Sequence, residues 1–330
     1  MKKLLLILAF AGLCFSSAEA QKKGQEQPKK KVPYTHRTCS EVATRRTDII
    51  LPQVKGFNCY KGDFHIHTSY SDGRVNPKGR VLEAWYDGLD VIAITDHYEP
   101  DEVKSGIAAP FRFPEMVQDV LTAKETYKDQ LQVALGIEYG QPYLEPDEIQ
   151  PTVTAYPYDI ILGSVHYIPG KPYFISRNYR ELTEDERRAI FDEYLDTYNV
   201  LVHTEGIDVV THPTYPLRYL LRQNIPFDMR DWEERLRAMF RVLVERGVGL
   251  EFNAAPMRVP NQGIPDHTVE TFFRWYREVG GEIVTFASDA HFTQHVGAYC
   301  DRTMRILREL GFRYVAVYEN RKPVFHKIEF

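Results

Sequence analysis

Histidine and carboxylate side chains recur through this 330-residue chain, and most of them follow directly on short apolar runs. His65 and His67 stand two residues apart at the end of the first run. Because residues i and i+2 of a strand point to the same side, both imidazoles can reach one ion. Imidazole and carboxylate ligands together suit Zn, Mn or Fe better than Ca or Mg, which prefer oxygen ligands alone. The spacing therefore indicates a site for a divalent transition metal.

Five further runs end in residues of the same types, so that six of the 11 histidines end a predicted strand. Each motif alone has an ordinary explanation, since Asp96 could cap a turn and Glu138 could pair with an arginine. Their joint position at six of seven predicted strand ends favours a common role. The residues concerned are His65, His67, Asp72, Asp96, His97, Glu138, His166, His212, Asp289 and His291.

Seven apolar runs predict strands, and six longer amphipathic stretches between them predict helices. We expect strands at residues 57–66, 91–95, 133–137, 160–165, 209–211, 249–252 and 283–287, and helices at 77–86, 114–128, 184–205, 231–245, 268–279 and 301–310. We expect loops at 139–152, 168–182 and 213–230, and a terminal strand within 314–330. Repeated strand–helix units predict parallel strands with helices outside them. Seven units favour a closed barrel, whose strand ends all open on one face and would bring the ligand-type residues together.

The motifs at these strand ends resemble, in the same order, those of the polymerase and histidinol phosphatase (PHP) family of metal-dependent phosphoesterases. The matching segments are His65-x-His67 with Asp72-Gly73, Thr95-Asp96-His97, Gly136-Ile137-Glu138, Gly163-Ser164-Val165-His166, Thr211-His212-Pro213 and Ser288-Asp289-Ala290-His291. The resemblance implies an α/β fold, a distorted (β/α)7 TIM-like barrel in a single domain.

The resemblance also implies a site for up to three divalent ions, with Zn, Mn or Fe as the candidates. One ion would be held by His65, His67, Glu138 and Asp289, a second by Glu138, His166 and His212, and a third by Asp72, His97 and His291. Glu138 would thus bridge two ions. Glu138, His212 and Asp289 would serve catalysis through a hydroxide held between metals.

Electrostatics makes phosphate chemistry plausible for such a site. Three divalent ions carry more positive charge than the three carboxylates and one hydroxide remove, so the pocket would attract a phosphate dianion. Arg258, Arg218 and Arg177 lie on segments after strands and are candidates for binding that phosphate, because guanidinium groups match its geometry. Asp96 is a candidate for orienting a ligand imidazole from behind, or for capping a turn.

The leading hypothesis is an enzyme that hydrolyses a small phosphomonoester or nucleotide phosphate. An amidohydrolase-type C–N hydrolase or deaminase is an alternative, but many of those enzymes bridge two metals with a lysine of the fourth strand, and residues 160–166 contain no lysine. A second alternative is a non-catalytic, exported metal-binding module, against which the complete ligand set argues.

The N-terminus has the features of a secretory signal peptide over residues 1–20. Lys2 and Lys3 precede an apolar run, and Ala18-Glu19-Ala20 is a small-x-small cleavage site. The run is too short to span a membrane, which needs about 20 apolar residues. We therefore expect an exported protein, periplasmic or extracellular, cleaved after Ala20.

A basic polar linker follows at residues 21–37, and residues 38–330 are expected to form the hydrolase domain. Of the 41 Lys and Arg residues and 46 Asp and Glu residues, eight and two respectively lie within residues 1–37, so the remainder carries a net charge of −11. Such an acidic body argues against binding a nucleic-acid polymer. Because export implies an oxidising compartment, we favour a disulfide between Cys39 and Cys59.

Overall fold

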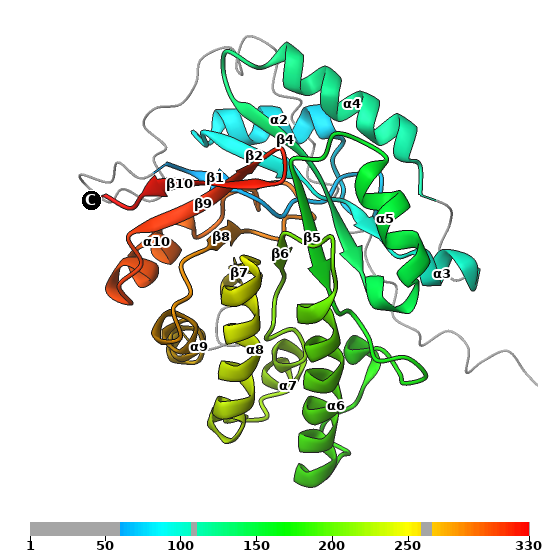
Figure 1. Cartoon of the computed structure of the whole chain (residues 1–330), viewed down its shortest axis with the longest axis vertical. Helices are drawn as coiled ribbons and strands as arrows, with labels where there is room; N and C mark the ends of the chain where they lie inside the picture. The colour runs from blue at the N-terminus through cyan, green and yellow to red at the C-terminus, as the bar shows by residue number, and fades with distance from the viewer. Residues whose placement is uncertain (1–59, 107–110, 259–265, 330) are drawn as a thin grey trace, which may run out of the picture. The chain divides into compact units, whose positions relative to one another are not determined.

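The computed structural model describes residues 60–106, 111–258 and 266–329. The predicted signal peptide, the linker and the Cys39–Cys59 pair lie outside these described residues. Seven parallel strands form one sheet in the order β1-β2-β4-β5-β6-β7-β8 (Figure 1). They are β1 (Gly62–Asp63), β2 (Val91–Ile94), β4 (Gln132–Gly140), β5 (Ile160–Ser164), β6 (Val209–Val210), β7 (Gly249–Asn253) and β8 (Val284–Ala287). A short extra strand, β3 (His97–Tyr98), also pairs with β4.

The sheet closes between its first and last strands, but not through a regular ladder. Beyond the end of β1, Ile66 and Ala290 form a single parallel bridge, and the backbone N–H of Phe64 donates to the carbonyl of Phe286 at 3.0 Å. Strand β1 is therefore only two residues long, where the apolar run predicted a longer one. The prediction of a distorted, seven-stranded parallel barrel is confirmed.

Helices lie around the outside of this barrel (Figure 1). They are α2 (Pro77–Tyr86), α3 (Pro100–Lys104), α4 (Phe113–Thr126), α5 (Pro146–Thr154), α6 (Glu184–His203), α7 (Leu217–Arg222), α8 (Glu233–Arg246), α9 (Asp266–Glu278) and α10 (Cys300–Glu309). The start of α6 is fixed by a capping box, in which Thr183 and Glu186 exchange hydrogen bonds between side chain and backbone. None of the helices in the described ranges is long and apolar enough to cross a membrane.

Two of the predicted loops contain α-helices. Helix α5 begins at Pro146 inside the segment 139–152, ends two residues beyond it at Thr154, and contains Pro151. Proline is tolerated in the first turn of a helix, so Pro146 did not exclude a helix there. Helix α7 lies within 213–230, and its six residues are too few to produce a visible apolar period.

The interior of the barrel has an apolar floor beneath a polar upper layer. The floor is formed by alternate strand residues, among them Phe64, Val91, Ile160 and Leu162, and is covered by residues 316–318. Those three belong to β9 (Tyr314–Glu319), which pairs with β10 (Lys322–Lys327) in an antiparallel hairpin rather than the single strand expected. Because strand side chains alternate, the next inward positions toward the carboxyl ends carry the polar groups of the site.

Candidate metal centre

Glu138 on β4 lies at the centre of the predicted ligands, and its side chain is 1% exposed. On one side, its Oε2 lies 3.1 Å from Nε2 of His65, 3.6 Å from Nε2 of His67 and 3.0 Å from Nδ1 of His97. Asp289 joins this side, with Oδ1 3.4 Å from Nε2 of His67. Residues at the ends of four strands thus gather on this side of Glu138.

The second oxygen of Glu138 faces two other histidines. Its Oε1 lies 3.0 Å from Nε2 of His166, which follows β5, and 2.9 Å from Nε2 of His212, which follows β6. The two carboxylate oxygens therefore point to two different sets of imidazoles. This is the arrangement that a carboxylate bridging two cations requires.

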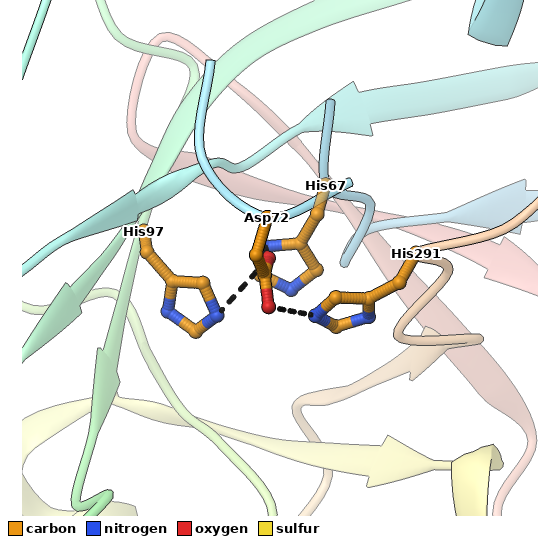
Figure 2. A group of neighbouring side chains, drawn as sticks. All are labelled: His67, Asp72, His97 and His291. Atoms are coloured by element: carbon orange, nitrogen blue, oxygen red, sulfur yellow. Dashed lines mark ion pairs between the residues drawn. The ribbon is translucent and has the colours of Figure 1, made fainter. Parts of the chain in front are cut away.

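A third group lies further out, around Asp72 (Figure 2). The carboxylate of Asp72 lies 3.1 Å from Nε2 of His291 and 3.7 Å from Nε2 of His97. The His67 ring lies between those two histidines, with ring centroids 4.1 Å from His291 and 4.3 Å from His97. His67 therefore belongs to this group as well as to the first, which the family resemblance did not imply.

The donor atoms of the site fit bound cations. Within the part of the chain that the structure describes, five buried polar atoms here have no hydrogen-bond partner: Nε2 of His65, Nδ1 and Nε2 of His67, Nδ1 of His97 and Oε2 of Glu138. Buried polar groups are otherwise almost always paired, since leaving one unpaired costs about 1–3 kcal/mol. Imidazole nitrogens and carboxylate oxygens are the ligands expected for Zn, Mn or Fe.

Two pKa shifts in the cluster point the same way, although neighbouring carboxylates outweigh burial and raise the pKa values of His65, His97, His166 and His291. Burial alone would raise the pKa of Glu138, but the neighbouring charges of His65, His166 and His97 lower it well below its ordinary value. Burial and repulsion from His97 and His291 lower the pKa of His67 well below its ordinary value. An ionised carboxylate and a neutral imidazole are the forms that bind metal ions.

Two of the three candidate arginines reach the cavity beside these ligands. Arg218 of α7 and Arg258 line a lobe of about 580 Å³ that also contains Glu138, His212 and Asp289. Arg218 is 8% exposed, its Nη1 lies 3.6 Å from Oδ2 of Asp289, and its Nε and Nη2 have no hydrogen-bond partner among the described residues. Arg218 therefore lines the lobe with a guanidinium that keeps unpaired N–H donors.

Arg258 and Arg177 are engaged differently. Nη2 of Arg258 donates to the carbonyl of Asp289 at 3.0 Å, and its Nη1 donates to the carbonyl of Ser288, so this arginine fixes the end of β8 at the rim of the lobe. Arg177 donates from Nε to the carbonyl of Pro172 at 3.0 Å and does not line this lobe.

Asp96 holds a loop rather than an imidazole. It is completely buried and accepts hydrogen bonds from the backbone N–H and hydroxyl of Thr68, both at 2.7 Å, and from the hydroxyl of Ser71 at 2.6 Å. These contacts fix the turn that carries Asp72. Of the two roles considered for Asp96, the geometry matches turn capping.

Sequence reasoning missed two carboxylates that contact the site. Glu251 of β7 lies with Oε2 2.6 Å from Nδ1 of His65, and Glu99 lies with Oε1 2.7 Å from Nδ1 of His166. The signal for Glu251 was a lone charge inside the predicted strand 249–252. Glu99 gave the weaker signal of an acid two residues after His97.

Comparisons with known proteins identify the family of the chain. Residues 63–255 match the PHP domain family. The histidinol-phosphatase of Lactococcus lactis is 23% identical over 267 residues, covering 79% of this chain and 96% of that protein. A probable histidinol-phosphatase of Thermotoga maritima is 25% identical, covering 81% of this chain and 99% of that protein.

Solved structures show the same fold. The crystal structure of the histidinol phosphate phosphatase of Lactococcus lactis, complexed with zinc, L-histidinol and phosphate, superposes with a TM-score of 0.67 at 23% identity, covering 80% of this chain and 99% of that one. A putative histidinol phosphatase from Listeria monocytogenes gives a TM-score of 0.59 at 18% identity, covering 73% and 99%. The chain therefore belongs to the PHP domain family of metal-dependent phosphoesterases, as its motifs predicted.

Proposed function

We propose that this chain is an exported enzyme that hydrolyses a small phosphomonoester at a cluster of divalent ions. The observation that carries the proposal is the pairing of two features in one cavity: a group of buried ligand atoms around Glu138, and the unpaired N–H donors of Arg218 beside Asp289. The first feature suits cations and the second suits a phosphate anion.

The ligand residues and the two arginines have different proposed roles. Glu138 would bridge two ions through its two oxygens, with His212 and Asp289 completing the ligands on either side of it. When bound, divalent ions lower the pKa of water toward neutrality, which supplies the hydroxide nucleophile, and withdraw charge from phosphoryl oxygens. Arg218 would orient the phosphate, and Arg258 would hold the backbone of Asp289 in place.

The alcohol part of the substrate has a separate place to bind. A second lobe of about 420 Å³ adjoins the first, since Asp72, His97 and His166 line both. Its other lining residues include Tyr70, Phe111, Tyr173 and the acid Glu102, and none of the described lysines or arginines lines it. This lobe suits a compact alcohol with an aromatic ring or a positive charge. L-Histidinol phosphate, the substrate in the names of the relatives, is one compound of this kind.

The test is phosphate release by the mature chain loaded with Zn²⁺, Mn²⁺ or Fe²⁺. The substrates are an aryl phosphate, L-histidinol phosphate, a nucleoside monophosphate and a phosphodiester. We expect hydrolysis of phosphomonoesters by the wild-type protein and none by the double variant His67→Ala, Asp289→Ala, while circular dichroism shows that the variant is folded. Equal rates for the two proteins would rule out the proposed site.

Metal content and export are tested separately. Elemental analysis of the purified chain should find up to three divalent ions, with fewer in the double variant. Export predicts that the full-length chain, expressed in a Gram-negative host, is recovered from the periplasm or medium with Gln21 as its first residue. Recovery of uncleaved protein in the cytoplasm would contradict the export proposal and leave the enzymatic one intact.

A further inference from the structure

We propose that Glu251 and Glu99 are positioning residues, each of which fixes the tautomer of one ligand histidine so that its Nε2 atom faces Glu138. The inference rests on the proposed function, because it assigns these residues a role toward bound cations. It comes from two separate elements of the fold that show the same arrangement on opposite sides of Glu138.

The first arrangement lies inside the barrel, below the ligands. The Glu251 side chain is completely buried, and its Oε2 lies 2.6 Å from Nδ1 of His65. Its Oε1 accepts hydrogen bonds from the backbone N–H of His212 at 3.1 Å and from Nδ2 of Asn253 at 2.9 Å. Three donors thus converge on one carboxylate, and two of them belong to predicted ligands of different ions.

The protonation of His65 follows from the chemistry of its partner. An ionised carboxylate can only accept hydrogen bonds, so in the neutral ring that binds a cation Nδ1 of His65 carries the hydrogen. The lone pair is then on Nε2, the atom 3.1 Å from Oε2 of Glu138. In the other tautomer, Nε2 would carry a hydrogen and could not bind a cation.

The second arrangement lies at the other oxygen of Glu138. Oε1 of Glu99 lies 2.7 Å from Nδ1 of His166, whose Nε2 lies 3.0 Å from Oε1 of Glu138. Gln141 completes this contact, because its Nε2 donates to Glu99 at 2.6 Å and its Oε1 accepts from the backbone N–H of His166 at 2.6 Å. Any side chain at Gly140 would overlap the Glu99 carboxylate, so the glycine makes the contact possible.

Glutamine is the informative substitution at both positions. In Glu251→Gln, only one side-chain oxygen remains to accept from the three donors. The amide N–H₂ group then faces either Nδ1 of His65 or the donors of His212 and Asn253, and it cannot accept from them. We expect the His65 ring to lose its fixed tautomer. Removing a partner of this kind typically lowers metal affinity about 10–100-fold.

The experiment measures zinc binding to the metal-free mature chain by chelator competition, with Zn²⁺ as the only added ligand. We expect Glu251→Gln and Glu99→Gln each to bind Zn²⁺ about 10–100-fold more weakly, with the same number of ions at saturation. Long-range ¹H–¹⁵N spectra of histidine-labelled protein should show that His65 is protonated at Nδ1 in the wild type and loses this preference in Glu251→Gln.

Asp159→Asn is the matched control. Asp159 is also a buried carboxylate, 4% exposed, but its partners are the backbone N–H groups of Leu135 at 2.9 Å and Asn320 at 3.2 Å and the Lys124 ammonium. We expect its zinc affinity to stay within about twofold of the wild type, even if its stability falls. Should Glu251→Gln fail to fold, Glu251→Asp and Glu99→Gln still test the inference.

Two results would overturn it. Zinc affinities and histidine spectra equal to those of the wild type would show that the carboxylates do not position the rings. A lower number of bound ions at saturation would show that Glu99 or Glu251 is itself a ligand. Both readouts are independent of turnover, so a chain that binds zinc as expected but releases no phosphate would contradict the proposed function alone.

Discussion

Replacement of Arg80 by methionine should destabilise the fold more than almost any other single change of a charged residue. Arg80 lies on α2 and is completely buried. Its Nε donates to the carbonyl of His67 at 3.0 Å, Nη1 to the carbonyl of Phe292 at 2.8 Å, and Nη2 to the carbonyl of Ala290 at 3.1 Å. Its Nη1 also lies 3.0 Å from the carboxylate of Glu83. One guanidinium thus joins the segments that follow β1 and β8, where the barrel closes.

The magnitude follows from what the substitution leaves behind. Methionine fills most of the volume, so little cavity forms, but the carbonyls of His67 and Phe292 lose their partner. The Ala290 carbonyl keeps only the backbone N–H of His67, and the Glu83 carboxylate keeps only the backbone N–H of Gln294. Breaking a buried ion pair by removing one member costs about 3–5 kcal/mol, and a hydrogen bond to a charged group contributes about 1.5–3 kcal/mol. Because these contributions overlap, we expect a loss of about 3–5 kcal/mol, a large part of the 5–15 kcal/mol typical of a domain.

The assay is urea unfolding of the metal-free proteins, followed by circular dichroism. Arg188→Met is the control, since Arg188 forms an exposed ion pair with Asp231 at 2.8 Å, and such pairs contribute about 0–1 kcal/mol. Arg80→Lys should lose nearly as much as Arg80→Met, because an ammonium cannot reach all three carbonyls at once. A loss below about 1 kcal/mol for Arg80→Met would refute the reasoning that this side chain ties the closure of the barrel.

Three further predictions concern metal, substrate and pH. Chelation should abolish phosphate release and lower the Tm, because the buried ligand atoms lose their cations. Added Zn²⁺ or Mn²⁺ should restore both the rate and the Tm. A rate of phosphate release that resists the chelator would count against the metal cluster. Arg218→Ala should weaken competitive inhibition by inorganic phosphate about 10-fold or more, whereas Arg177→Ala should leave the inhibition within about twofold of the wild type. Equal effects of the two substitutions would contradict the role of Arg218 in binding phosphate. Burial raises the pKa of Asp208 above its ordinary value of 3.8, despite the opposing contact with Arg321, so the folded state favours the protonated acid. The wild type should therefore lose stability relative to Asp208→Asn as the pH rises above 3.8. Urea unfolding of both proteins across that pH range measures this. A difference in unfolding free energy that stays constant with pH would contradict the raised pKa of Asp208.

The cluster of ligand-type residues could be predicted from sequence because parallel strands share one direction. A residue that ends a parallel strand lies at the same edge as the residues that end its neighbours, whatever their separation in sequence. His65 and Asp289 are 224 residues apart in the chain, yet both lie beside His67. The length of each apolar run and the motif after it were sufficient for this inference.

The supporting residues could not be predicted in the same way. Glu251 contacts a histidine 186 positions away, and its role depends on which face of β7 points inward. Arg80 looks like an ordinary exposed residue of an amphipathic helix, since its carbonyl partners have no sequence signature. The short β1 is a further case, because its irregular pairing with the last strand depends on backbone contacts such as that of Phe64 with Phe286.

The hairpin of β9 and β10 limits when the barrel can complete its folding. The side chains that cover its apolar floor, Ala316 to Tyr318, are synthesised after all seven barrel strands. A nascent chain still missing them exposes Phe64, Ile160 and Leu162 at the open end of the barrel. The barrel floor therefore stays uncovered until the hairpin is present, and chains shortened before residue 316 should be substrates for chaperones and proteases.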